Sequence, residues 1–494
     1  MTISSRAGIS VLGAGIVAGF AAAVGLWVVW FVTHLPWINL PERHSIIGLL
    51  VCWLGAFVAC GYNLGRARGW VVGLTGGVIS AVLGLLVLGS KLRPPASIEG
   101  ELQAVHPSAG VVALGFVAMG AVVGLVGGTA GGMMAPASRA SDPEPDWLGR
   151  FAWVTCAAAM PLLFIGGLVT STDSGMAVPD WPNTFGSNMF LYPLGPRSAS
   201  DVYLEHSHRL FGTLLGLSAV VLTIWTVRRN ATQLVRTLML VLPVLVGSVS
   251  LGLILFAKVH AGFVFAVVGI LGMAAAVAWR EPRGARWPKV LALLVLAFIV
   301  IQGWLGGTRV LEDSRARAII HGVSAQAILA GLVGLAVYLS PSFARLATID
   351  PPAKESRRLK FLATALMHSL LLQLILGAVY RHLRHGHVLW THAAFAMVVL
   401  VAALAAGTVA QAYRRDQGGP ARAIRLAGTW VLAVVGVQFV LGWVAFMGAG
   451  QGLNTASVTQ ALIRTAHQAN GALLLAAATV LFVMARQANR LAAR

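Results

Sequence analysis

Four histidines in this sequence have the type and placement to do chemistry. They are His208, His321, His392 and His467, and each lies near one end of a long apolar run. Ionisable side chains in apolar runs of this length are costly to bury and are commonly functional. Imidazole is the commonest metal ligand among side chains, so these residues predict a metal or redox-cofactor site. Each histidine taken alone is also compatible with a packed, hydrogen-bonded core residue.

An internal repeat relates the four histidines. Segments 163–170 and 374–381 resemble each other, and each precedes a run that opens on a histidine, His208 or His392. A Gln-x-x-Leu-Gly word recurs at 302–306, 373–377 and 438–442. The repeat predicts two four-helix units, with His208 and His321 in the first and His392 and His467 in the second.

The first histidine pair is spaced more widely than the second, by about the length of a hairpin at 234–280. That hairpin reads as an insertion in the first unit. It contains His260, which follows a weakened copy of the repeated word at 248–252. His260 is therefore an ambiguous candidate, either a degenerate repeat member or a replacement ligand for His321.

All four repeat histidines fall within about a turn or two of the same end of their runs, so they share one depth. Two imidazoles from facing helices form an axial ligand pair for a planar macrocycle, and helix-bundle cores commonly hold such sites. Two pairs predict two heme sites. Zinc or copper is the competing reading, but no Cys, Asp or Glu completes a ligand shell near His392 or His467 in sequence.

Other polar residues near the histidines have two readings each. Arg309, Arg381 and Arg464 lie at span ends, where guanidinium groups can pair with heme propionates or extend to lipid headgroups. The glutamines of the repeated words, at 302, 373 and 438, favour interhelical hydrogen bonding over substrate contact. His382, His385 and His387 form a loop cluster that is compatible with simple solvation.

The two units differ one turn before the first histidine, where Glu205 stands in one and Leu389 in the other. Glu205 and His208 share a helix face. A carboxylate at the edge of a macrocycle can exchange protons as a substrate is oxidised, whereas a leucine cannot. The first unit is therefore predicted to be catalytic and the second to hold a permanent heme that relays electrons. The alternative is that Glu205 only pairs with Arg209 or a loop lysine.

The elements that position these residues are expected to span a membrane. Hydrophobic residues make up 57% of 494 positions and charged residues 11%, which excludes an ordinary soluble protein. The net charge of +20 lies in loops without basic, aromatic-interleaved patches, so no nucleic-acid partner is expected. Apolar runs predict an all-α polytopic fold of about fourteen helices. Three cysteines in apolar runs predict no disulfide framework.

Arginine and lysine clusters fall in alternate loops, which the positive-inside rule assigns to the cytoplasm. Both termini are then cytoplasmic, segment 172–204 lies outside, and the first span is retained rather than cleaved. A bacterial inner membrane fits this pattern best.

A composition break at 133–149 predicts a cytoplasmic linker. It separates an N-terminal four-span region (1–132), of unknown role, from the first unit (151–340) and the second (360–486). Glycines 73, 76 and 77 in the N-terminal region are interpreted as helix-packing surfaces.

Residues 151–486 resemble the heme A synthase family. The matching words are Gly166-Gly-Leu-Val-Thr170, Ser174-Gly-Met-Ala-Val-Pro-Asp180-Trp181-Pro182 and Glu205-x-x-His208-Arg209, followed by the later histidines. The resemblance implies oxidation of a methyl group of heme O to the formyl group of heme A. It places the essential glutamate at Glu205, the substrate-heme ligands at His208 and His321, and the ligands of a heme b cofactor at His392 and His467.

The implied partners are the enzyme that supplies heme O, an unidentified electron donor and terminal oxidase assembly factors. The sequence departs from the family in its N-terminal extension, its inserted hairpin and its lack of an outer-loop cysteine pair. Two other functions remain open. A bis-histidine membrane cytochrome b would only transfer electrons, and a transporter would usually place broken helices and polar groups at the midplane.

Overall fold

The structure is a computed structural model of the chain. It describes residues 3–88, 107–137, 145–192, 199–348, 351–414, 419, 421–448 and 457–493. The centre of the predicted linker, residues 138–144, lies outside the described residues.

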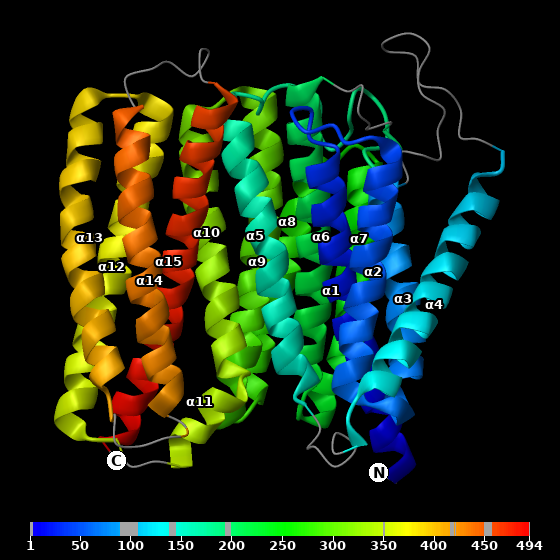
Figure 1. The fold of residues 1–494 in the computed structure, drawn as a ribbon, viewed down its shortest axis with the longest axis horizontal. Coiled ribbons are helices and arrows are strands. Elements are labelled where there is room, and N and C mark those ends of the chain that lie inside the picture. Colours follow the sequence, from blue (N-terminus) through cyan, green and yellow to red (C-terminus); the bar gives the residue numbers. More distant parts are fainter. Residues whose placement is uncertain are drawn as a thin grey trace. The chain divides into compact units, whose positions relative to one another are not determined.

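Long α-helices account for nearly all of the described chain (Figure 1). Their bounds are α1 (Ile3–Thr33), α2 (Glu42–Leu64), α3 (Arg66–Leu88), α4 (Ala109–Met134), α5 (Trp147–Ser171), α6 (Ser200–Arg228), α7 (Gln233–Leu255), α8 (Val259–Arg280), α9 (Arg283–Glu312), α10 (Arg315–Tyr338), α11 (Pro341–Arg345), α12 (Ala353–Leu383), α13 (Gly386–Ala412), α14 (Ala421–Met447) and α15 (Val458–Leu491). A short 3-10 turn, η3 (Leu346–Thr348), precedes α12.

Fourteen of the described helices are long and apolar enough to cross a membrane, which confirms the predicted number of spans. Helices serve here because every backbone N–H and C=O within a bilayer must find a partner inside the segment itself. Polar caps mark some helix starts: the Ser314 side chain accepts from the Arg317 N–H. Ser457 and Gln460 form a reciprocal capping box at the start of α15. Between α2 and α3 the chain turns at Gly65, whose φ of 76° suits glycine.

The chain divides into two compact units, the first comprising residues 1–169 and 174–218. In this unit α3 and α4 cross through glycines. A methyl group on Gly73 would strike the Gly124 carbonyl, and one on Gly77 would strike the Gly120 carbonyl. Gly76 faces Phe57 of α2 and Gly19 of α1. Glycines 73, 76 and 77 are thus packing surfaces, as predicted.

Helix α1 packs against α5 and the first half of α6 within the first unit. Its Trp27 meets Phe211 edge to face at 5.4 Å, and Phe31 stacks on Tyr203 at 5.7 Å. The Tyr203 hydroxyl donates to the Phe31 carbonyl at 2.8 Å. These contacts join the N-terminal helices to the helix that carries Glu205 and His208.

The second unit comprises residues 170–173 and 219–494. Helices α12 to α15, yellow to red in Figure 1, lie side by side, and α10 contacts both α12 and α15. A hydrophobic core in this unit joins the end of α6 to α7, α8 and α9. Its buried residues include Val227, Met239, Met273 and Leu293.

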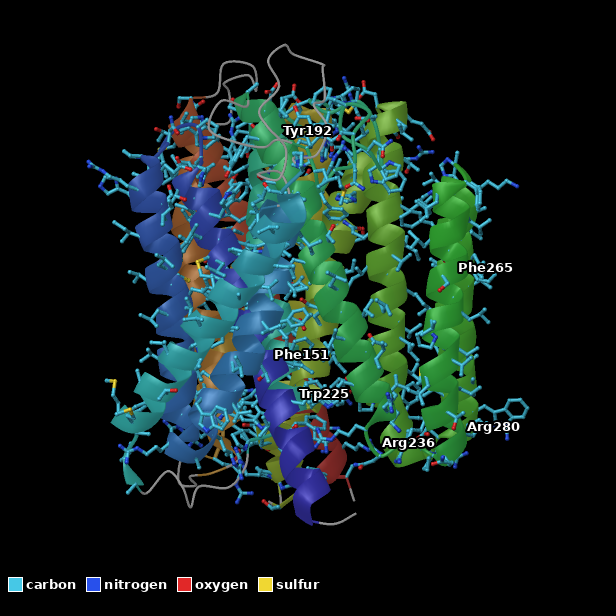
Figure 2. The ribbon with its side chains drawn as sticks, turned by 90° about the vertical axis from the view of Figure 1, so that its right-hand side faces the viewer. Phe151, Tyr192, Trp225, Arg236, Phe265 and Arg280 are labelled. Carbon is cyan, nitrogen blue, oxygen red and sulfur yellow. The ribbon has the colours of Figure 1, made fainter. Side chains whose placement is uncertain are left out.

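The α7–α8 hairpin lies in the second compact unit. It corresponds to the insertion that the sequence predicts within the first four-helix repeat unit. Phe265 points away from it, and Arg236 and Arg280 lie at the same end of the pair (Figure 2). At that end the buried Glu281 carboxylate accepts a hydrogen bond from the Lys289 ammonium at 2.6 Å and from the Thr232 N–H at 2.9 Å.

Candidate heme-ligand site

The four repeat histidines lie within the first three turns of four different helices. His208 is on α6, His321 on α10, His392 on α13 and His467 on α15, and each is half-buried. His208 belongs to the first compact unit and the other three to the second.

Each of these histidines packs its ring edge against a glycine of the preceding repeat helix. A methyl group placed on Gly166, Gly306 or Gly377 would lie 2.9 Å from the Cε1 atom of His208, His321 or His392, respectively. The fourth contact is looser: a methyl group on Gly442 would lie 3.3 Å from Cε1 of His467. Real Cβ atoms essentially never approach another atom to 2.9 Å, so the first three positions admit the ring only because they are glycine, whereas at Gly442 a small shift would be enough. We call Gly166, Gly306, Gly377 and Gly442 the histidine-contacting glycines.

His260, the ambiguous candidate on the inserted hairpin, is placed differently. Its Nδ1 accepts a hydrogen bond from the Trp304 indole at 2.9 Å, and its ring is exposed. The glycine of its weakened word, Gly252, has nothing within 4 Å of an added methyl group. His260 therefore lacks the glycine contact that the four repeat histidines share.

The glutamines of the repeated words form interhelical hydrogen bonds, as predicted, and these reach the histidines. The Gln302 amide donates to the His321 carbonyl at 2.7 Å, and the Gln373 amide donates to the His392 carbonyl at 2.9 Å. The Gln438 amide nitrogen lies 3.2 Å from Nδ1 of His467. Each glutamine stands four residues before a histidine-contacting glycine, so both share one helix face.

His392 and His467 lie next to each other in the second unit. Their ring centroids are 6.4 Å apart, with the planes at 80°. When two imidazoles bind one iron through Fe–N bonds of about 2 Å, their ring centroids lie about 6 Å apart. The spacing of this pair therefore fits a bis-histidine heme.

Cationic groups gather near this pair. The Arg381 guanidinium donates to the Gln468 side-chain oxygen at 2.7 Å and to the Ser171 hydroxyl at 2.6 Å, both neutral groups. Arg381, Arg309 and Arg384 all lie close enough to His382 to interact with it electrostatically. Arg464 stands one turn before His467 and donates to the Gly448 carbonyl at 3.2 Å. This distribution of charge suits carboxylate groups such as propionates.

Glu205 is buried, with 4% of its surface exposed, and it holds a loop against α6. One carboxylate oxygen accepts from the Val178 N–H at 2.8 Å, and the other pairs with Arg209 at 2.8 Å. The ion pair with Arg209 was the structural alternative to a catalytic role, and it is present. It leaves the carboxylate one turn from His208 on the same helix.

Sequence reasoning missed the part that Arg209 plays in this loop. Its guanidinium donates to the Val178, Asp180 and Asn183 carbonyls at 2.7 to 2.9 Å. The Asp180 carboxylate in turn accepts from the Phe185 and Gly186 N–H groups. In the sequence, the only indication of this function is that Arg209 follows His208 in the Glu205-x-x-His208-Arg209 motif.

The described residues contain no group of three or more His, Cys, Asp or Glu side chains that could hold a metal ion. Cys52, Cys60 and Cys156 are free thiols in the structure. Among the four repeat histidines, His392 and His467 are the two whose rings the structure places next to each other.

Fold and site together define a multi-pass helical membrane protein with repeated histidine–glycine contacts. A family model described as cytochrome oxidase assembly protein matches residues 149–254 and 258–393, which include His208, His321 and His392. The matched part of the chain belongs to this family, and the relatives described next are heme A synthases.

The heme A synthase of Halalkalibacterium halodurans is 30% identical over 178 residues, which cover 35% of this chain and 41% of that protein. The heme A synthase of Lysinibacillus sphaericus is 39% identical over 82 residues, or 16% of this chain and 25% of that protein. The matched segments thus span less than half the length of these bacterial relatives. No solved structure matches the chain.

Proposed function

We propose that this protein is a heme A synthase, which oxidises a methyl group of heme O to the formyl group of heme A. The observation that carries the proposal is the buried Glu205 carboxylate one turn before His208. The other three histidines have Ala318, Leu389 and Arg464 at that position. Family membership and the identity to heme A synthases support the same reaction.

The residues proposed to hold the two hemes follow the repeat. His208 and His321 would ligate the substrate heme, and His392 and His467 would ligate heme b, with Arg309 and Arg381 paired to propionates. The sequence repeat assigns α5, α6, α9 and α10 to the first four-helix unit and α12 to α15 to the second. Heme b, when bound, supplies one-electron redox chemistry.

The reaction defines what Glu205 would do. Conversion of a methyl group and water to a formyl group releases four protons and four electrons. The electrons need a carrier of the heme or quinone class, and the protons need an acceptor at the reacting edge. Glu205 is proposed as that acceptor, and Arg209 holds its carboxylate in place at 2.8 Å.

The same proposal gives the protein its setting. It would lie in a bacterial inner membrane with both termini in the cytoplasm, receive heme O from the enzyme that makes it, and deliver heme A to terminal oxidase assembly. An electron carrier outside the chain completes the set of partners.

Coexpression with a heme O source, in cells that lack heme A, tests the proposal. Hemes extracted from the wild type are expected to include heme A, whereas the Glu205→Gln variant should retain heme O. Asp201→Asn, which changes an exposed acid on the same helix, is the matched control and should still yield heme A.

A membrane cytochrome b is the second candidate, and the Glu205–Arg209 ion pair favours it because that pair gives Glu205 a purely structural use. The same experiment separates the two functions. Heme b alone, with heme O unchanged in the wild type, would support the cytochrome and contradict the synthase.

A further inference from the structure

We infer that the histidine-contacting glycines are positioning residues that fix the ring orientation of the four axial histidines. The inference rests on the proposed heme-binding function. It starts from the near identity of three contacts. An added methyl group on Gly166, Gly306 or Gly377 would lie 2.9 Å from Cε1, 3.4 to 3.5 Å from Nδ1 and 3.7 to 3.8 Å from Nε2 of the facing ring.

General helix packing does not account for this agreement. Three different pairs of helices bring the same edge of an imidazole to the same atom of a glycine. Other close glycines meet a variety of groups, such as the Leu432 side chain at Gly407 and the Val246 side chain at Gly269. The one degenerate repeat member, Gly252 before His260, has no such contact.

The mechanical consequence follows from helix geometry. A glutamine one turn before the glycine bonds the main chain of His321 or His392, and the glycine limits where the ring can lie. The main chain and the ring of His321 and of His392 are thus both contacted by one face of the neighbouring helix. In α5 the corresponding position is Leu162, so His208 is held by its glycine without a glutamine at this position.

The contacts also predict a gradient within the second pair. Gly377 approaches His392 more closely than Gly442 approaches His467, at 2.9 Å against 3.3 Å for the added methyl group. Alanine at 377 must displace the ring or the helix, whereas alanine at 442 requires a shift of a few tenths of an ångström. Gly377→Ala should therefore disturb heme ligation more than Gly442→Ala.

The test compares four glycine-to-alanine variants of the full chain, purified with their heme. Gly377→Ala and Gly442→Ala alter the histidine contacts. Gly407→Ala adds a methyl group 2.6 Å from Leu432, away from any histidine, and Gly436→Ala on α14 meets nothing within 4 Å. The readouts are the low-spin electron paramagnetic resonance signal, the absorption spectrum and the reduction potential of heme b. Wild type and His392→Ala provide the reference states.

Gly377→Ala is expected to lose much of the six-coordinate low-spin signal and to shift the potential. Gly442→Ala should change in the same direction by less, and Gly407→Ala and Gly436→Ala should match the wild type. An unchanged spectrum in Gly377→Ala overturns the inference, as does an equal change in Gly407→Ala. If Gly377→Ala does not fold, an unchanged spectrum in Gly442→Ala still decides against it.

The proposed function fails separately from the inference. Wild-type protein without heme, or His392→Ala with an unaltered heme spectrum, contradicts heme ligation itself and the inference with it. Heme that is lost in His392→Ala but unchanged in Gly377→Ala contradicts only the positioning role.

Discussion

Glu205 distinguishes the helix that carries His208 from the helices that carry the other three repeat histidines. The helix positions equivalent to it hold Ala318, Leu389 and Arg464, and none of these side chains can accept a proton at pH 7. Glu205 also fastens the loop that begins at Ser174, through Val178 and Arg209. The Glu205 carboxylate is thus expected both to accept protons and to attach the loop to α6. Arg209 contacts both this carboxylate and the loop.

Replacement of Arg209 by methionine should detach this loop. Hydrogen bonds to charged groups contribute roughly 1.5–3 kcal/mol each, so heme A yield should fall by about 10-fold or more. Heme in the His392–His467 pair should be retained. Quantified heme extracts measure both effects, with Arg236→Met, at an exposed arginine of α7, as the control. An undiminished heme A yield would show that the loop does not depend on Arg209.

Glu281 provides a pH-dependent contribution to stability. Burial raises the pKa of its carboxyl, but hydrogen bonds from Lys289 and Thr232 outweigh burial, so the pKa lies below its usual 4.5. A lowered pKa contributes stability that is present above about pH 4.5 and is lost as the pH falls through the folded-state value.

Glu281→Gln should therefore unfold more easily than the wild type at pH 7, by about 1–3 kcal/mol, because the Lys289 ammonium loses its charged partner. The difference should shrink as the pH falls below about 4.5. Thermal unfolding of the two purified proteins across this pH range provides the measurement. A difference that stays constant from pH 7 to pH 3 would mean that Glu281 does not carry the effect.

At the scale of the helices, hydropathy predicted the spans because lipid leaves the chain no other way to satisfy its backbone. Glycine spacing likewise predicted the close packing of α3. The pairing of each histidine with a glycine was not predicted, although both belonged to the repeat, because sequence similarity does not reveal which helix faces meet. The loop attachment by Arg209 and the Glu281–Lys289 pair had no periodic signal at all.

The α3–α4 crossing should be sensitive to added bulk. Gly124→Val places a side chain against the Gly73 carbonyl and the Gly77 Cα, and overpacking of this kind costs about 1–3 kcal/mol. Gly115→Val on the same helix is the control, since nothing lies within 4 Å of an added methyl group there. Limited proteolysis of the N-terminal helices should detect the first change only. Equal protease resistance of Gly124→Val and wild type would argue against tight packing.

At the scale of the whole molecule, the N-terminal extension is joined to the proposed catalytic helix. Trp27 and Phe31 of α1 pack on Phe211 and Tyr203 of α6, in the unit that also holds Glu205 and His208. Hydropathy does not predict this contact, because it does not reveal which helix faces meet. We therefore expect the extension to support α6 mechanically.

Trp27→Ala tests this support. Loss of a buried tryptophan costs about 3–5 kcal/mol, so thermal stability and heme A yield should both fall, with the heme of the His392–His467 pair retained. Trp70→Ala on α3, where 46% of the side chain is exposed, is the matched control. Unchanged heme A yield in Trp27→Ala would dissociate the extension from the reaction.

The number and type of hemes per chain tests the central claim, that two non-equivalent histidine pairs hold two hemes. Pyridine hemochrome spectra of purified protein, from cells supplied with heme O, resolve heme b from heme O and heme A. The wild type should hold one heme b and one heme of the O or A type. The double variant His392→Ala/His467→Ala should lose heme b selectively. A single heme per chain, or heme b that persists in the double variant, would contradict the account.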